Sequence, residues 1–211
     1  MSRVRCLLDR RHPPSQASNA RPGPGLTQGN VNSMRTFITT IVLMVLTLTG
    51  LPALAVEEGD PAPAFSLTDG QGRDIAFPEH SAGAPAIVFF WATWCPYCHA
   101  LMPYLQQIKN DYAKHGVEVY AISFKDDGDP VEHMHELGHD FIVMPVGDLV
   151  ADDYDVWSAP GILVVDGKGV VRYKRRSVGA DVKPGKEIAE FWDGKVRAAL
   201  DLSLQDSNAA P

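Results

Sequence analysis

The stretch "AIVFFWATWCPYCH", residues 86–99, decides how this chain folds. Residues 86–91 are a continuous apolar run of β-branched and aromatic side chains, which is typical of a strand buried on both faces. Cys95 and Cys98 follow directly, in a segment that fits two motifs. As C-x-x-C-H it is the attachment sequence of a c-type haem with His99 as an iron ligand, and as W-C-x-x-C it is a redox dithiol.

Pro96 predicts that Cys95 lies at the start of a helix. Proline favours the first helical position, and apolar side chains recur at helical spacing after the cysteines. They are Leu101, Leu105, Ile108 and Tyr112. Free backbone N–H groups and the positive end of the helix dipole stabilise a thiolate, which a nucleophile in disulfide exchange needs. Cys98, one turn further on, is placed to resolve the mixed disulfide, so both cysteines are candidate catalytic residues.

The haem alternative requires more than the motif. It needs an apolar pocket for the porphyrin and usually a second axial ligand, for which Met134 and Met144 are the candidates. Pro96 and the buried strand fit a turn at the edge of a sheet better. We therefore favour the dithiol, with His99 on the exposed side of the helix, and because a dithiol carries the electrons itself we expect no cofactor and no metal.

The rest of the chain alternates strands and helices. Strands are expected at residues 64–67, 74–77, 86–91, 117–123, 162–166 and 170–174, and helices directly after the cysteines, at 131–137 and at about 186–202. The last helix is expected to bury Ile188, Phe191, Trp192 and Val196, and the tail after it to fray. This order predicts one α/β domain with a central sheet flanked by helices and preceded by a β-hairpin.

Two segments of the sequence resemble a known superfamily. "FFWATWCPYC" is similar to the active-site strand and turn of thioredoxin-fold proteins, and "APAFSLTDGQGRDIAF", residues 62–77, is similar to the opening hairpin of the exported TlpA and ResA branch. The resemblance covers about residues 59–200. It implies a thioredoxin-like fold with a mixed sheet, a TlpA-type insert of an extra strand and helix, and thiol–disulfide oxidoreductase activity.

The same resemblance predicts a substrate groove. In this family a cis-proline, usually within V-x-G-x-P-T, faces the dithiol, and here "VWSAPG" makes Pro160 the candidate, with Ser158 and Gly161 departing from the pattern. A substrate chain is expected to pair with the backbone beside Ala159. The predicted substrate-binding residues are Trp94, Pro96, Tyr97, Ala159 and Pro160.

The direction of electron flow is less determined. Reductants of this fold resemble one another in keeping a buried carboxylate near the resolving cysteine, but the two positions that carry it in relatives hold Phe89 and Leu101 here. Glu118 and Asp126 follow, and nothing in the sequence brings either to the sulfurs. The working hypothesis is a protein disulfide reductase, with a role in cytochrome c maturation, kept reduced by a membrane electron donor. An oxidant or isomerase is the alternative.

The sequence offers three further alternatives. "HELGH", residues 135–139, matches the zinc-protease motif H-E-x-x-H, but Gly138 predicts that the helix ends inside it, so that the two histidines do not share a metal. The peroxidase motif P-x-x-x-[ST]-x-x-C fails because position 88 is Val and Thr93 lies one residue out of register. A purely structural disulfide stays open, since the two cysteines are the only sign of catalysis.

The N-terminal region predicts export. A charged start at Met34, an apolar run at residues 37–51 and an A-x-A site at residues 53–55 are the parts of a signal peptide cut after Ala55. The run of fifteen residues is short for a membrane span, which needs about 20. We expect a disordered or mis-assigned start at residues 1–33, a signal at 34–55, and a thioredoxin-like domain at 56–211 that is periplasmic or secreted.

Charge and cysteine content of the mature chain limit its partners. Residues 1–55 hold six of the 19 Lys and Arg but one of the 26 acids, so 13 basic and 25 acidic residues remain and the net charge is about −12. A chain of this charge repels nucleic acid and anionic membrane surfaces, so neither is an expected partner. Cys95 and Cys98 are its only cysteines. The expected partners of this monomer are disulfides or dithiols of exported proteins.

Overall fold

Strand β3 (Ala86–Trp91) is the centre of the fold in the computed structural model, which describes residues 55–175 and 184–208. The five-stranded sheet has the order β5-β4-β3-β6-β7. Strand β3 runs parallel to β4 and antiparallel to β6, so the sheet is mixed. The other strands are β1 (Phe65–Thr68), β2 (Asp74–Phe77), β4 (Glu118–Ser123), β5 (Ile142–Met144), β6 (Gly161–Val165) and β7 (Val171–Lys174). The helices are η1 (Glu79–Ser81), α2 (Pro96–Asp111), η2 (Ala113–His115), α3 (Pro130–Leu137), α4 (Asp148–Asp153) and α5 (Lys186–Asn208).

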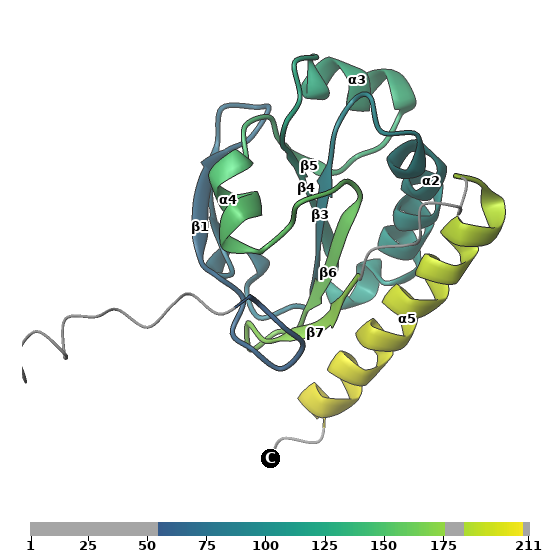
Figure 1. Cartoon of the computed structure of the whole chain (residues 1–211). Helices are drawn as coiled ribbons and strands as arrows, with labels where there is room; N and C mark the ends of the chain where they lie inside the picture. Colours follow the sequence, from purple (N-terminus) through teal and green to yellow (C-terminus); the bar gives the residue numbers. More distant parts are fainter. Residues whose placement is uncertain (1–54, 176–183, 209–211) are drawn as a thin grey trace, which may run out of the picture. The chain divides into compact units, whose positions relative to one another are not determined.

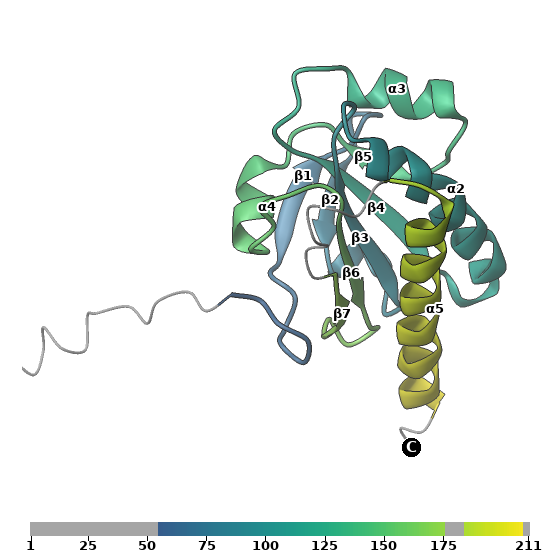
Figure 2. The ribbon, with the colours of Figure 1, turned by 45° about the vertical axis from the view of Figure 1, so that its right-hand side comes forward.

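Alternation along β3 divides the apolar core between the two faces of the sheet. Ile87, Phe89 and Trp91 face α2 and α5, where Leu105 and Trp192 belong to the same cluster. The intervening residues pack against the β1–β2 hairpin and α4 on the other face. Figures 1 and 2 show these two layers on opposite sides of the sheet. All six side chains of β3 are buried, as the apolar run predicts.

The predicted order of elements is confirmed, with two additions and two corrections. The predicted TlpA-type insert called for an extra strand and helix before Pro160, but the positions of strand β5 and helix α4 were not predicted. Helix α5 runs to Asn208, so the expected fraying after residue 202 is wrong. Within this last part, the hydroxyl groups of Ser203 and Ser207 donate to carbonyls one turn earlier. The side chain of Phe191 is 56% exposed, because it lies outside the stripe that buries Trp192.

The predicted leader lies almost wholly outside the described residues. The expected start at residues 1–33 and the signal peptide at 34–55 therefore stay predictions. Within the part of the chain that the structure describes, no helix is both long enough and apolar enough to cross a membrane.

Candidate active site

Cys95 and Cys98 form a disulfide at the N-terminus of α2, with their Cα atoms 5.3 Å apart. Cys95 is the N-cap residue, and its Sγ accepts a hydrogen bond from the backbone N–H of Cys98 at 3.1 Å. Pro96 occupies the first turn of the helix, as predicted. The backbone N–H of Cys95 bonds to the carbonyl of Ala92, which folds the chain tightly between β3 and α2.

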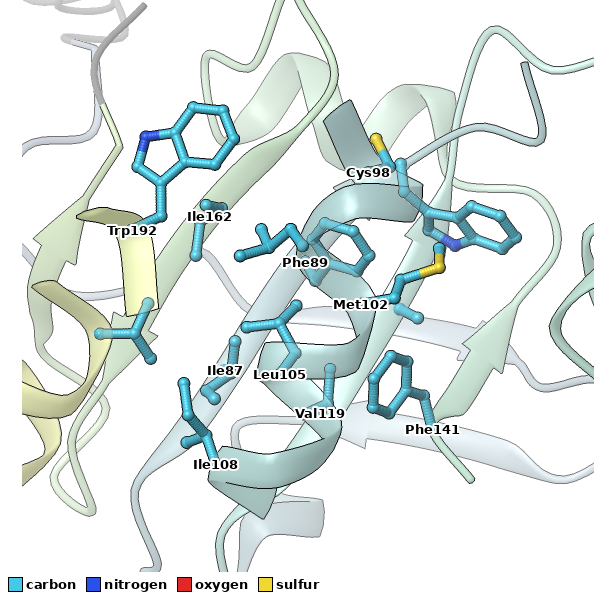
Figure 3. Packing of buried hydrophobic residues seen from close by; sticks show 14 of the residues in the cluster. Ile87, Phe89, Cys98, Met102, Leu105, Ile108, Val119, Phe141, Ile162 and Trp192 are labelled. Atoms are coloured by element: carbon cyan, nitrogen blue, oxygen red, sulfur yellow. The ribbon is translucent and has the colours of Figure 1, made fainter. Parts of the chain in front are cut away.

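The inner side of the disulfide is apolar. Cys98 is fully buried and belongs to the same cluster as Phe89, Leu101 and Met102. Figure 3 shows Cys98 and Met102 on α2, with Phe89 near them. The two positions expected to carry a carboxylate are therefore filled by side chains that cannot exchange a proton. Glu118 does not replace them, because it pairs with Lys109 in the last turn of α2 at 3.1 Å.

Asp126 stabilises the turn before the cysteines by binding Thr93. Its carboxylate accepts hydrogen bonds from the backbone N–H and the hydroxyl of Thr93, both at 2.6 Å, and from Ser123 Oγ at 2.9 Å and the Gly128 N–H at 3.1 Å. Burial alone would raise the pKa of Asp126, but these hydrogen bonds hold the pKa of the carboxyl below its usual value. An ionised Asp126 thus fixes the turn. The acidic loop "FKDDGDP" was the only sequence signal of it.

Pro160 directly precedes β6, and its peptide bond has the predicted isomer. The Ala159–Pro160 peptide bond is cis, and β6 begins directly after it, with Gly161 opposite Phe90 near the end of β3. Because β6 is antiparallel to β3, Pro160 stands at the end of the sheet from which the dithiol extends. A Cβ atom at Gly161 would lie 3.0 Å from Phe90 Cβ and 2.6 Å from Val156 Cγ1, which explains the departure from the family pattern.

Two exposed indoles flank the dithiol and the cis-proline. Trp94 is 56% exposed and donates its indole N–H to the carbonyl of Lys125 at 2.9 Å. Trp157, which sequence reasoning missed, is 65% exposed, and the Lys125 ammonium lies 5.6 Å from its ring centroid. The backbone N–H of Lys125 also bonds to Asp148 at 3.0 Å. Of the other predicted groove residues, Pro96 is exposed, and Tyr97 and Ala159 are partly buried.

Comparison with known proteins gives the family. The profile described as "AhpC/TSA family" matches residues 58–174, more than half of the chain. The chain belongs to the AhpC/TSA family. It is 31% identical over 143 residues to "Thiol:disulfide interchange protein DsbE" of Escherichia coli (strain K12), which covers 64% of this chain and 74% of that protein. It is 31% identical over 149 residues to "Thiol-disulfide oxidoreductase ResA" of Geobacillus thermodenitrificans, a match that covers 66% of this chain and 83% of that protein.

Solved structures agree on the fold of this AhpC/TSA family member. A crystal structure of a putative thiol:disulfide interchange protein DsbE from Chlorobium tepidum has a TM-score of 0.58 at 23% identity, covering 69% of this chain and 99% of that one. This likeness confirms the thioredoxin-like fold, and the relatives confirm the predicted class of thiol–disulfide oxidoreductase. The peroxidase motif is still absent around Cys95, since Val88 stands where that motif has Pro.

Two sequence interpretations about histidines are resolved in this AhpC/TSA protein. His99 is half-buried and meets His133, so the expectation of an exposed His99 is wrong. Helix α3 ends at Leu137, and Gly138 has a left-handed φ of 73°, so the helix ends inside "HELGH" as predicted. The ring of His139 stacks on Phe141, whereas His135 is exposed. Across residues 55–175 and 184–208, no group of three or more His, Cys, Asp or Glu side chains is arranged to hold a metal.

Proposed function

We propose that this thiol–disulfide oxidoreductase reduces disulfides of exported proteins in the periplasm or outside the cell. The observation that carries the proposal is the position of Cys95, whose sulfur caps α2 at the end of the sheet where the cis-proline also lies, directly after the exposed Trp94 in the chain. A thiolate at a helix N-terminus is stabilised by the free N–H groups there. The groove of Trp94, Pro96, Tyr97, Ala159 and Pro160 is our proposed site for the substrate chain.

The proposed reaction passes two electrons to the substrate. The Cys95 thiolate attacks one sulfur of a substrate disulfide, which breaks the substrate S–S bond, forms a mixed disulfide and releases a thiolate that takes up a proton. Cys98 then loses its proton and attacks Cys95 Sγ. The Cys95–Cys98 bond forms, the mixed disulfide breaks, and the second substrate thiolate is released and protonated. A dithiol donor at the membrane would reduce the resulting disulfide and so complete the cycle.

The substrate class includes proteins with a C-x-x-C-H segment. Resemblance to the TlpA and ResA branch favours apocytochromes whose cysteines must be reduced before haem is attached. The strongly acidic mature chain favours protein substrates over nucleic acid or anionic lipid. We propose that the protein acts as a monomer.

A disulfide oxidant or isomerase is the second candidate. It is favoured by the apolar side chains of Phe89 and Leu101, which leave no carboxylate beside the buried Cys98. A thiol in such surroundings lacks the proton acceptor that reductants of this fold place there.

The redox state of the dithiol distinguishes the two candidates. Alkylation in intact cells, followed by a mobility shift, measures the fraction of reduced Cys95 and Cys98, and equilibration with glutathione gives the reduction potential. A reductase is expected to be mainly reduced, with a potential near that of thioredoxin, about −270 mV. A mainly oxidised dithiol with a potential near about −120 mV would establish the oxidant instead.

Two variants and one sequencing experiment complete the test. Cys98→Ser is expected to trap exported proteins on Cys95 as mixed disulfides, and Cys95→Ser, the matched control, is expected to trap none. Equal trapping by both variants would show that Cys95 is not the nucleophile. N-terminal sequencing of the exported protein is expected to begin at Val56.

A further inference from the structure

Two imidazole rings meet beside the dithiol. His99 lies in the first turns of α2, directly after Cys98, and His133 lies in α3. Their Nε2 atoms are 3.0 Å apart, and the ring centroids are 5.0 Å apart with an interplanar angle of 32°. On its other side, the ring of His133 stacks on Trp91 of β3, with the centroids 6.1 Å apart. The reaction proposed above uses neither histidine.

Helix geometry directs His99 toward Cys95. The backbone N–H of His99 bonds to the carbonyl of Cys95 at 3.2 Å, so the two residues are one helical turn apart. Side chains four residues apart share a helix face, and they lean toward the N-terminus. The backbone of Thr93, in the turn that carries Cys95, accordingly acts on the His99 ring and raises its pKa, against the larger effects of burial and His133.

The short Nε2–Nε2 distance limits how many protons the pair can hold. Because Nε2 of His99 faces Nε2 of His133 at 3.0 Å, one of these nitrogens donates the hydrogen bond and the other accepts it. Nδ1 is then the nitrogen of His99 left to face the backbone of Thr93. If both rings were protonated, two N–H groups would point at each other, so the pair can hold one extra proton but opposes a second.

The direction of the pKa shift of His99 agrees with a pair that opposes a second extra proton. Burial, and then the charge of His133, lower the pKa of His99, although the hydrogen bond to Thr93 acts in the opposite direction. Asp126 reaches the pair only through Thr93, and β3 contributes the uncharged Trp91. The other titratable groups nearby are Asp129, Glu132, His135 and Glu136 along α3 and Tyr97 on α2, whose ring packs toward Trp192.

We propose that the His99–His133 pair is a positioning unit for Cys95. The one extra proton that the pair holds places a positive charge near the turn, and this charge stabilises the Cys95 thiolate. In this step the S–H bond of Cys95 breaks, the electron pair stays on sulfur, and the proton forms an N–H bond on the pair. The pair acts on Cys95, whereas the carboxylate that Phe89 and Leu101 replace would act on Cys98. The inference rests on the proposed function only in taking Cys95 as the nucleophile, and it holds for either direction of electron flow.

The test is the pH dependence of Cys95 alkylation by iodoacetamide, in reduced protein purified from cells that express the full chain. The wild-type rate is expected to show two inflections, the lower one belonging to the pair. His99→Asn should remove the lower inflection and slow alkylation near neutral pH by about two- to fivefold, the effect of a partly screened opposite charge. His133→Asn should move the lower inflection to higher pH, because it removes the charge that opposes protonation of His99.

His135→Asn is the matched control, since His135 is exposed on the same helix two residues from His133. It should reproduce the wild-type profile. The inference is overturned if His99→Asn keeps both inflections, or if His135→Asn has the same effect as His99→Asn. A Cys95 that shows no thiolate-dependent alkylation in any variant would instead reject the proposed function.

Nuclear magnetic resonance of the wild type provides a test that needs no variant. The ring of His99 should titrate at higher pH in the reduced protein than in the disulfide form, because a nearby thiolate favours the imidazolium and coupling between two sites is reciprocal. Identical titration of His99 in both redox states would contradict the inference even if every variant failed to fold.

Discussion

Thr93 donates both its backbone N–H and its hydroxyl to the carboxylate of Asp126, each at 2.6 Å. This pair ties the turn between β3 and α2 to the loop that follows β4. Cys95 lies two residues after Thr93, so the position of the dithiol depends on Asp126, which is distant in sequence. None of the hydrogen bonds described for the Asp126 carboxylate involves a cysteine sulfur.

Asp126→Ala should therefore loosen the turn and destabilise the protein. Hydrogen bonds to charged groups contribute about 1.5–3 kcal/mol each, and removal leaves the N–H groups of Thr93 and Gly128 without this acceptor. We expect the free energy of unfolding to fall by about 2–3 kcal/mol in urea titrations. Asp127→Ala, at the exposed neighbour, is the control and should stay within about 0.5 kcal/mol of the wild type. Equal effects of the two substitutions would contradict the role of Asp126.

Gly128→Ala tests how closely the loop approaches Thr93. An added Cβ would lie 2.5 Å from Thr93 Oγ1 and 3.2 Å from both Cβ and Cγ2 of Thr93. Overpacking of this kind costs about 1–3 kcal/mol, and we expect thermal unfolding to shift to lower temperature accordingly. Gly185→Ala is the control, because no atom lies within 4 Å of the added Cβ there. A wild-type melting temperature for Gly128→Ala would show that the loop can move away from Thr93 without loss of stability.

Asp69 and Asp166 should make the fold sensitive to acid. Burial would raise the pKa of each carboxyl, but hydrogen bonds from neighbouring backbone N–H groups and from Arg73 or Arg172 lower it below the ordinary value. A lowered pKa in the folded state gives stability that is present above the unfolded-state pKa and is lost as the pH falls through the folded-state value.

We therefore expect the free energy of unfolding to decrease below about pH 4. The double variant Asp69→Asn and Asp166→Asn should be less stable at neutral pH but should show a flatter dependence between about pH 4 and pH 2. Chemical denaturation at several pH values measures both slopes. The exposed Asp152→Asn serves as control and should keep the wild-type slope, and an unchanged slope in the double variant would show that other carboxylates dominate.

Leu101→Glu would place a carboxyl where relatives of the ResA type carry one. Leu101 is fully buried here, so burial should raise the pKa of the new carboxyl. A raised folded-state pKa means that the variant loses more stability as the pH rises. We expect a loss of about 3–5 kcal/mol at pH 7 and a clearly smaller loss near pH 4, measured by thermal unfolding. Leu101→Met, which keeps the volume, should cost less than about 1.5 kcal/mol, and a pH-independent loss for Leu101→Glu would contradict the burial argument.

Local patterns predicted the parts of the site that depend on nearby residues. The apolar run of β3, the proline after Cys95 and the proline before β6 each act within a few residues, and the structure places all three as expected. Strand β5 and helix α4, with three and six residues, are too short for hydrophobic periodicity to identify. The His99–His133 and Thr93–Asp126 contacts join segments more than thirty residues apart, and a single sequence shows no spacing between them.

The sulfur atom of Cys95 takes part in two structural interactions. Cys95 Sγ closes the disulfide and also accepts the N–H of Cys98 that begins α2. A sulfur keeps lone pairs as a thiolate, in a mixed disulfide and in the closed disulfide, so the first helical turn retains an acceptor at every stage of turnover. The first turn of α2 can therefore keep its hydrogen bond while the bonds at Cys95 are exchanged.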